Sequence, residues 1–398
     1  MSDLKAQPSQ AGARLAQISL YGLICLTPIL TWLAPLAFAP VVGLCGLLTL
    51  PGVRLKSSDR TILLVLVVSL VWACGSTLWS PYVPPSLAKS TALKLVPIVA
   101  LYYSAVLSAR LVPIHSVSRL LQLLIWGTVL LAVVMVAESL TYAGVYRALR
   151  QAIGDPIRPD LGVKNVAQGL FILCLLVPVA SAAALRFRGG IALVAILLVG
   201  TLFPSFAFGY DAPIMALGLG ALGAALVWYV PTQGPRILAA ASAIYVMGAP
   251  VVVWGLGQAG LYEEIRSKVS LSWSQRMGYW AHAQDWIAAR PLQGWGLDAS
   301  RAFGPGIQLH PHDGALQVWM ELGLIGAVVA TILWGDLLTG LSRKSSDLAA
   351  AASAGSAIVY LTFGAVSFGV WQEWWLAAGA LTATLCALLQ RNAREAST

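Results

Sequence analysis

The stretch "RLLQLLIWGTVLLAVVMVAESLTY", residues 119–142, is a long run dominated by Leu, Val and Ala side chains. Apolar runs of about 17–25 residues have the length that a helix needs to cross roughly 30 Å of hydrocarbon. Similar runs recur from Arg14 to the C-terminus, and the alternating segments of a membrane β-barrel are absent from the sequence. The sequence therefore predicts an all-α, polytopic membrane protein.

Composition indicates the same class. The chain has 398 residues, of which 58% are hydrophobic and 10% charged, and a mean hydropathy of +0.78, which a water-soluble domain does not show. Positive loops facing anionic lipid explain part of the net charge of +9, so membrane lipid and not nucleic acid is the expected partner. All five cysteines fall within predicted spans, which favours apolar packing over a disulfide framework or a zinc site.

Hydropathy and helix breakers together predict about twelve transmembrane helices. The predicted spans are residues 14–34, 35–51, 60–79, 90–109, 119–142, 165–185, 190–207, 211–230, 236–257, 313–340, 347–370 and 374–390. The prolines of "LAPLAFAP" leave a kinked turn as the alternative for the second span. The first span is expected to stay as a membrane helix, because no convincing small-residue cleavage site lies near its end.

Basic residues decide the predicted orientation. With twelve helices, most short basic loops lie on the same side as both termini, and the positive-inside rule makes that side cytoplasmic. We therefore expect nine helices and a basic loop at 143–164 within residues 1–257, a large, partly helical loop at 258–312, and the last three helices with a short cytoplasmic tail at 313–398. The two long loops lie on the side opposite the termini.

Both of these loops carry basic residues, which opposes the usual charge bias. They hold Arg147, Arg150, Arg158, Lys164, Arg266, Lys268, Arg276, Arg290 and Arg301. A ligand with dense negative charge, such as a diphosphate, is the functional explanation. Solvated loop charge and contact with lipid headgroups is the structural alternative.

One part of the second loop is predicted to be a helix. Large side chains recur at helical spacing in Trp273, Met277, Trp280 and Ile287, a stripe that can lie on the membrane surface. Arg276 lies beside this stripe, where a guanidinium held between indoles is well placed for phosphate. Pro291 ends the helix, and "PLQGWGLDAS" supplies a glycine-rich turn.

Two of the four histidines, His310 and His312, stand just before the tenth predicted span and are followed by Asp313. A metal site needs more ligands, and the chain has no HExxH, DxD or cysteine set, so we expect neither metal nor cofactor. A structural role at the helix start, with Asp313 as N-cap, is a second interpretation. The third is general acid–base chemistry, for which a neutral imidazole is the natural base near neutral pH.

Other chemistry has little support in the sequence. There is no GxSxG elbow and no glycine-rich nucleotide loop after a strand. Group transfer from a membrane-borne activated donor remains, or transport. A transporter of lipid-linked sugars would place ionisable residues near mid-membrane and often shows paired repeats, and neither is clear here.

The segment "SQRMGYWAHAQDWIAARPLQGWGLDASRAF" and the later "HPHDGALQVWMELGLIG" resemble the signature region of the O-antigen ligase and O-antigen polymerase superfamily. With "RPDLGVKNVAQGL" and the helix layout, the resemblance covers most of the chain, although only about fifty residues are specific to the motif. It places the catalytic histidine on His312, with His310 as an additional residue before it. Asp313 stands where the family usually has Asn.

A second departure concerns an arginine. Family members commonly carry one at the start of the eighth helix, but the matching stretch here has Tyr210 and Asp211. Either another arginine, such as Arg158 or Arg147, fills that space, or the alignment is displaced there.

The resemblance implies a metal-independent, inverting glycosyltransferase of the integral-membrane type, similar to the type C fold. Such enzymes move a glycan from undecaprenyl diphosphate to an acceptor on the periplasmic face of a bacterial inner membrane, which makes the two long loops periplasmic. His312 would be the general base. The implied diphosphate- and substrate-binding residues are Arg276, Arg158, Arg147, Arg266, Arg301 and His310.

Within this class the acceptor separates the alternatives. A ligase uses lipid A–core oligosaccharide, whereas a polymerase uses a second lipid-linked glycan. The histidine-led segment joined directly to "LQVWMELG" and the single large late loop favour the ligase. A protein-targeting oligosaccharyltransferase is a third version, and a lipid-linked sugar flippase is the alternative from another class.

Overall fold

The computed structural model describes residues 10–304 and 306–395, and every regular element within them is a helix. The elements are α1 (Gln10–Leu33), η1 (Pro35–Ala37), α2 (Phe38–Thr49), η2 (Leu50–Gly52), η3 (Ser57–Asp59), α3 (Arg60–Ser76), η4 (Thr77–Trp79), η5 (Leu87–Lys89), α4 (Thr91–Ser108), α5 (Ile114–Leu140), α6 (Gly144–Ala152), α7 (Pro159–Ala184), α8 (Gly190–Phe208), α9 (Asp211–Tyr229), α10 (Gly234–Gln258), α11 (Leu261–Lys268), α12 (Leu271–Ala289), η6 (Ala299–Ala302), α13 (Gly314–Thr339), α14 (Leu348–Val366) and α15 (Glu373–Glu395). The prediction of an all-α, polytopic membrane protein is confirmed.

Eleven helices in the described part of the chain are long and apolar enough to cross a membrane. The predicted twelfth span corresponds to α15, which is long enough but is not among them because its polar ends and tryptophans lower its hydropathy. The second predicted span corresponds to η1, α2 and η2 together, a continuous helical stretch over Pro35–Gly52 that is among the eleven. Its two ends, which contain Pro35 and Pro51, are 3-10 helix, since proline lacks the N–H that an α-helix would need there.

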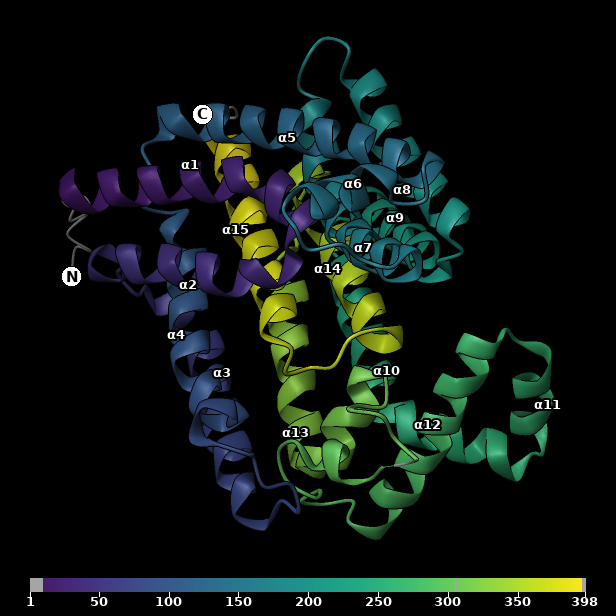
Figure 1. The fold of residues 1–398 in the computed structure, drawn as a ribbon. Coiled ribbons are helices and arrows are strands. Elements are labelled where there is room, and N and C mark those ends of the chain that lie inside the picture. Colours follow the sequence, from purple (N-terminus) through teal and green to yellow (C-terminus); the bar gives the residue numbers. More distant parts are fainter. Residues whose placement is uncertain (1–9, 305, 396–398) are drawn as a thin grey trace.

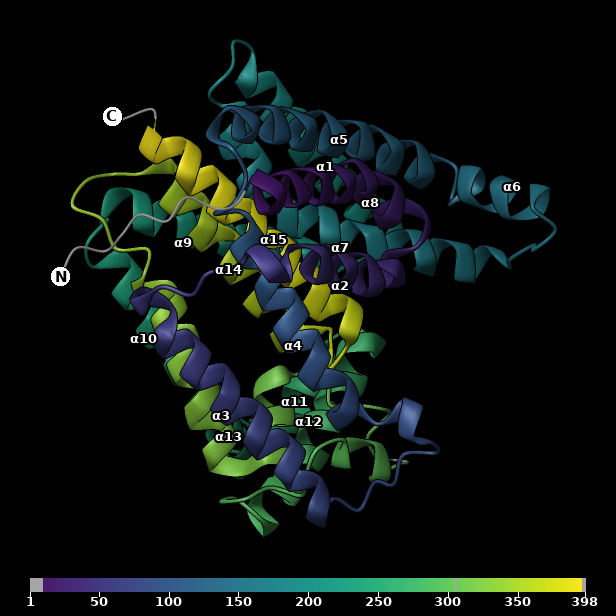
Figure 2. The same cartoon turned by 90° about the vertical axis from the view of Figure 1, so that its left-hand side faces the viewer.

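The helices form two sets that cross at a steep angle. In Figure 1, α1 and α5 run from side to side, whereas α3, α13 and α15 run from top to bottom. Figure 2 shows α6 at the far right and α11 and α12 below the centre, while α15 ends at the upper left. The two loop regions that carry α6, α11 and α12 therefore lie away from the end of the molecule where α15 terminates.

The centre of the first set is α7. This helix is almost fully enclosed, with Val166, Leu170 and Leu173 buried against α1, α5, α8 and α14. Gly169 permits the close approach of α1, because a Cβ at this position would lie 2.5 Å from the Thr31 carbonyl oxygen. Small residues at such crossings let membrane helices pack closely.

Hydrogen bonds donated by basic side chains join several loops at one end of the molecule. Arg391 donates to the carbonyl oxygen of Val112 (2.9 Å) and Arg343 donates to Gln390 (3.2 Å). Arg110 forms two hydrogen bonds of 2.7 Å with Asp59. These contacts bring together the loops before α3, after α4 and before α14, which the sequence assigns to one side of the membrane.

The long loops are more helical than the sequence indicated. Residues 143–164 include α6 and the start of α7, and residues 258–312 include α11 as well as α12. The α12 stripe predicted to lie on the membrane surface faces the protein instead, since Ile287 packs with Leu316 and Met320 of α13. The apolar face of α12 is therefore used to hold this helix, with Arg276, against the transmembrane domain.

Candidate active site

The histidine-led segment begins α13. Asp313 is the N-cap of this helix, and its carboxylate accepts from the Leu316 backbone N–H (2.9 Å) and from the Tyr245 hydroxyl of α10 (3.0 Å). Burial raises the pKa of Asp313 to about 6. These two hydrogen bonds hold Asp313, and with it the histidine-led segment, at the start of α13.

His312 is held in one orientation with one ring nitrogen available. Its backbone has a left-handed φ of 58°, which is uncommon for a residue with a side chain. Nδ1 lies 2.8 Å from the Ser367 carbonyl oxygen. Because a carbonyl can only accept, Nδ1 carries the proton and Nε2 keeps its lone pair.

His310 differs from His312 in having both ring nitrogens occupied. Its Nδ1 accepts from the backbone N–H of His312 (3.2 Å), and the Gln372 side-chain amide lies 3.3 Å from Nε2. Burial, with the charges of His312 and Arg301, lowers the pKa of His310 to about 3. The buried, neutral His310 ring therefore supports the turn that presents His312.

Arg276 is the cation of α12 that lies near His312. Burial lowers the pKa of His312, and the positive charge of Arg276 lowers it further, whereas the hydrogen bond to Ser367 raises it. The Arg276 guanidinium lies over the Trp273 ring, 5.0 Å from its centroid. Within the described residues Arg276 has no carboxylate within 4.0 Å, so its hydrogen-bond donors are available to a ligand.

The start of α9, which carries Asp211, also lies next to this part of α12. The Asp211 carboxylate accepts from the Trp273 indole N–H (3.4 Å), and its charge acts on Arg276. The start of α9, where the family arginine is missing, is therefore close to the α12 arginine. The Tyr279 ring, one turn after Arg276, stacks at 6.0 Å on the His312 imidazole.

The two predicted arginines of the first loop lie elsewhere. Arg158 pairs with Asp160 (2.7 Å) and its side chain is 73% exposed, while Arg147 packs against Gly162 of α7. Figures 1 and 2 both show α6 well apart from α12. The structure therefore does not bring Arg158 or Arg147 to the histidines.

The remaining two arginines have partners within the second loop. Arg266 donates to the Ser274 carbonyl oxygen (3.2 Å) and lies 3.3 Å from Glu263. Arg301 pairs with Asp298 (3.1 Å) and lies over the Tyr82 ring, and its charge reaches His310. Arg301 is thus near the histidine turn, whereas Arg266 connects α11 to α12.

A buried carboxylate near the site was not among the predicted residues. Glu321 of α13 is fully buried and accepts hydrogen bonds from the Asp298 backbone, the Ser300 hydroxyl, the Gln317 amide and the Trp371 indole (3.0, 2.6, 3.2 and 2.6 Å). We call these five residues the Glu321 cluster. The sequence does show a glutamate inside an apolar span, and an ionisable residue in such a place is expected to have hydrogen-bond partners.

The Glu321 cluster connects the segments that hold His312. Gln317 also accepts from the Val370 backbone N–H (2.9 Å), so the turn after α14 is bound to α13 at two points. That same turn supplies the Ser367 carbonyl to His312. The position of the His312 ring therefore depends on the cluster.

The two motif segments "PLQGWG" and "ELGLIG" bind each other. Gly323, with φ 66° and ψ −162°, interrupts α13. The Trp295 and Gly296 N–H groups donate to the carbonyl oxygens of Met320 (2.9 Å) and Glu321 (2.7 Å). The loop thus satisfies backbone groups that the break leaves without helical partners.

Replacing Gly296 by alanine is expected to lower the free energy of unfolding by about 1–3 kcal/mol, because its φ is strained for other residues. Its φ is +95°, and a Cβ would lie 2.4 Å from the Ser76 carbonyl oxygen. Thermal unfolding of the purified variant measures the effect. Gly304→Ala is the matched control, since the nearest atom among the described residues, apart from its chain neighbours, is the Ile307 carbonyl oxygen, 3.9 Å from its Cβ position. Equal stability of both variants would contradict the close packing described here.

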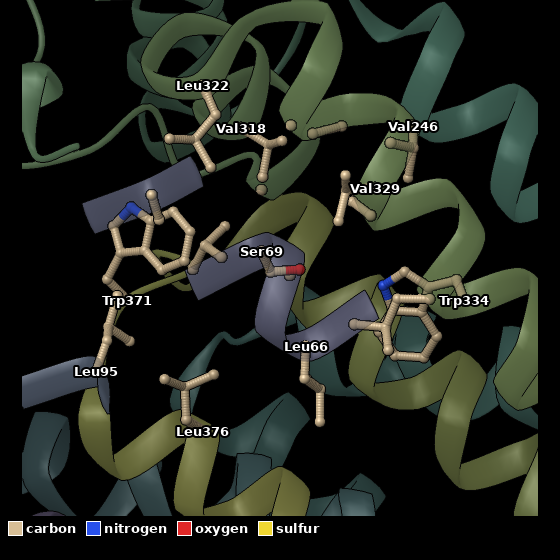
Figure 3. A pocket seen from close by; sticks show the side chains of 18 of the residues that line it. Leu66, Ser69, Leu95, Val246, Val318, Leu322, Val329, Trp334, Trp371 and Leu376 are labelled. Atoms are coloured by element: carbon tan, nitrogen blue, oxygen red, sulfur yellow. The ribbon is translucent and has the colours of Figure 1, made fainter. Parts of the chain in front are cut away.

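Next to the histidine turn lies an apolar cavity of ≈ 290 Å³, bounded by α3, α4, α10, α13, α14 and the 368–376 segment. Figure 3 shows Leu66, Val329 and Leu376 among the side chains around it. Gly314, two residues after His312, and Trp371 of the Glu321 cluster are among the residues that line it. The cavity therefore begins next to the candidate base.

No group of three or more His, Cys, Asp or Glu side chains that could hold a metal ion occurs in residues 10–304 and 306–395. The groups assembled at the site are instead an imidazole with a free lone pair, an unpaired guanidinium and an apolar cavity.

Comparison with known proteins places this site in a matched region. Residues 193–331 match a protein family described as O-antigen ligase. The predicted resemblance to the O-antigen ligase superfamily is confirmed. The region that matches the ligase family includes Arg276, His310, His312 and Glu321 but ends before Ser367.

Curated relatives match a similar share of the chain. A Rickettsia conorii protein named "Putative polysaccharide ligase RC0486" is 29% identical over 130 residues, which is 29% of this chain and 32% of that protein. A Rickettsia bellii protein named "Putative polysaccharide ligase" is 28% identical over 155 residues, 35% of this chain and 38% of its own length. The chain thus spans about a third of the length of the curated relatives it matches.

Proposed function

We propose that this protein is an O-antigen ligase that transfers a glycan from undecaprenyl diphosphate to lipid A–core oligosaccharide at the periplasmic face of a bacterial inner membrane. The observation that carries the proposal is the Nδ1 contact of His312 with Ser367, which leaves Nε2 as a base beside an unpaired arginine. The likeness to the O-antigen ligase family supports the class of reaction.

In the proposed reaction the acceptor hydroxyl attacks the anomeric carbon of the donor sugar. His312 Nε2 takes the hydroxyl proton, the bond from the anomeric carbon to the diphosphate oxygen breaks, and the new glycosidic bond forms with inversion. The electron pair leaves on undecaprenyl diphosphate, whose growing charge Arg276 stabilises. Because the leaving group is already a diphosphate with an arginine partner, the scheme assigns no step to a metal.

One further property of the site has a place in this scheme. The Arg276 guanidinium can bind two phosphate oxygens at once, which a lysine cannot. We retain Arg301, whose charge reaches His310, as a contact for the acceptor side, and assign no role to Arg158, Arg147 and Arg266.

The test is an in vitro reaction with purified protein, undecaprenyl-diphosphate glycan and lipid A–core, without ATP and with EDTA present. We expect glycan-modified lipid A–core as product. If lipid A–core is inert and a second lipid-linked glycan is extended instead, the protein is a polymerase. If no glycan is transferred but the donor crosses the bilayer of proteoliposomes, the protein is a flippase and the proposal fails.

Arg276→Lys is expected to raise the KM for the donor about tenfold, because one charge-assisted hydrogen bond to phosphate is lost. Initial rates over a range of donor concentrations give KM and kcat separately. The control is Arg266→Lys, since Arg266 is bound to Ser274 and Glu263 within its own loop. Normal kinetics in Arg276→Lys would show that Arg276 only anchors α12.

A further inference from the structure

Helix α6 has no role in the proposed reaction, yet its start is held by specific contacts. The chain turns from α5 into α6 at Tyr142 and Ala143, whose left-handed φ angles of 51° and 59° are uncommon for residues with side chains. Ala143 is the N-cap of α6 and has no side-chain oxygen. The Glu138 carboxylate of α5 instead accepts from the Tyr146 backbone N–H (2.8 Å) and from the Trp32 indole of α1 (2.6 Å). The start of α6 is therefore fixed to both α5 and α1.

One face of α6 is buried and another is apolar and uncovered. The buried face carries Tyr146, whose hydroxyl accepts from the Asn165 amide of α7 (3.3 Å). Val145, Leu149 and Ile153 recur every four residues and so share a second face. Their exposed fractions are 46%, 37% and 67%. Figure 2 shows α6 at the edge of the molecule, where this second face has no neighbouring helix.

The connection of α6 to α5 decides what covers the apolar face. Helix α5 is one of the membrane-spanning helices, and Leu130, Val133 and Leu140 on its outer side are exposed to lipid. Only residues 141–143 separate the end of α5 from the start of α6, so α6 lies at the boundary between hydrocarbon and headgroups. Tyr142, in this connection, is 65% exposed, and tyrosine is enriched at that boundary.

The charges of this loop favour acidic lipid. Its aspartates, Asp155 and Asp160, pair with Arg150 and Arg158. Two further cations, Arg147 of α6 and Lys164 in the second turn of α7, have no carboxylate within 4.0 Å among the described residues. An exposed apolar helix face with unpaired cations in the same loop is typical of segments that bind membranes with acidic headgroups.

We propose that α6 is an interfacial helix that inserts its apolar face into the lipid leaflet and binds acidic phospholipid headgroups through Arg147 and Lys164. This role is independent of the proposed transfer reaction. Helix α11 provides a comparison within the same chain. It also exposes apolar side chains, Leu261 and Ile265, but its two cations pair with its own two glutamates. Acidic lipid should therefore act on α6 and not on α11.

Hydrogen–deuterium exchange of the wild-type protein in nanodiscs tests the proposal. We expect the amides of α6 to exchange about tenfold more slowly in phosphatidylglycerol than in phosphatidylcholine, since each cation near an acidic surface strengthens binding about fivefold. The amides of α11 are the internal reference and should differ less than twofold between the two lipids. Equal exchange of α6 in both lipids, or an equal lipid effect on α11, overturns the proposal. Rapid exchange of α6 in both lipids would show that its apolar face serves a protein partner.

Substitutions assign the effect to the named residues. Arg147→Gln combined with Lys164→Gln should remove the difference between the lipids, and Lys164→Gln alone should reduce it about fivefold. The matched control is Lys268→Gln in α11, which should keep the full difference. Leu149→Gln should speed exchange of α6 in both lipids, whereas Gln151→Ala, at an exposed position of the same helix, should not. A lipid difference that persists in the double variant, or unchanged exchange in Leu149→Gln, overturns the proposed contact.

Discussion

His312→Ala is expected to lower kcat of glycan transfer by a factor of about 10²–10⁴, the usual contribution of a general base. The alanine variant should keep the fold, because within residues 10–304 and 306–395 the ring makes one hydrogen bond, to Ser367, and Asp313 still caps α13. Initial rates with purified protein, donor and lipid A–core measure the effect. Binding of the donor should change little, since the base acts on the acceptor hydroxyl.

The pH dependence gives this prediction a second measurement. A base must be neutral to accept a proton, and burial and Arg276 hold the pKa of His312 below its ordinary value. The acid limb of kcat/KM should therefore lie at a lower pH than an ordinary histidine would give. Arg276→Gln removes the positive charge, so it should raise the pKa of His312 and move the acid limb to higher pH.

His310→Ala is the matched control for His312→Ala. The His310 ring has both nitrogens occupied and only supports the turn, so its loss should reduce the rate far less. A larger loss in His310→Ala than in His312→Ala would reverse the assignment of the base. An acid limb at the ordinary histidine value in the wild-type protein would show that His312 does not titrate as described.

Glu321→Ala is expected to lower the free energy of unfolding by about 4 kcal/mol or more, because it leaves several buried donors without an acceptor. Thermal unfolding in detergent measures the loss. Transfer activity of the surviving protein should also fall, since the turn that supplies Ser367 to His312 is bound to α13 through Trp371 and Gln317. Glu321→Gln should be milder, because one carbonyl oxygen remains as an acceptor.

The control for Glu321 is another glutamate of the same domain. Glu373 forms an ion pair with Lys94 in which both side chains are 41% exposed, and such pairs contribute about 0–1 kcal/mol. Glu373→Ala should therefore unfold near the wild-type temperature. If Glu321→Ala is as stable as Glu373→Ala, the Glu321 cluster does not hold the loop on α13.

Much of the architecture was predictable because apolar length and the need to satisfy backbone groups in lipid leave only helices. The motif around His312 and the helix that carries Arg276 could also be predicted, since both depend on short spacings. The Glu321 cluster could not be predicted from spacing, because its donors come from Asp298, Ser300 and Trp371, which are far apart in the sequence. The predicted orientation of the α12 stripe toward the membrane surface was also wrong, because an apolar helix face can pack against other helices as well as against lipid.

The sequence by itself determined the class of the protein, the helices and the residue types at the site, because these follow from local composition and motif order. The tertiary structure alone decided which cations reach the histidines, since loop charges far apart in the chain meet only through packing. It placed Arg276 near His312 and left Arg158 with Asp160. It also decided which histidine keeps a free nitrogen, because that depends on the Ser367 carbonyl, a hydrogen-bond partner 55 residues further along the chain.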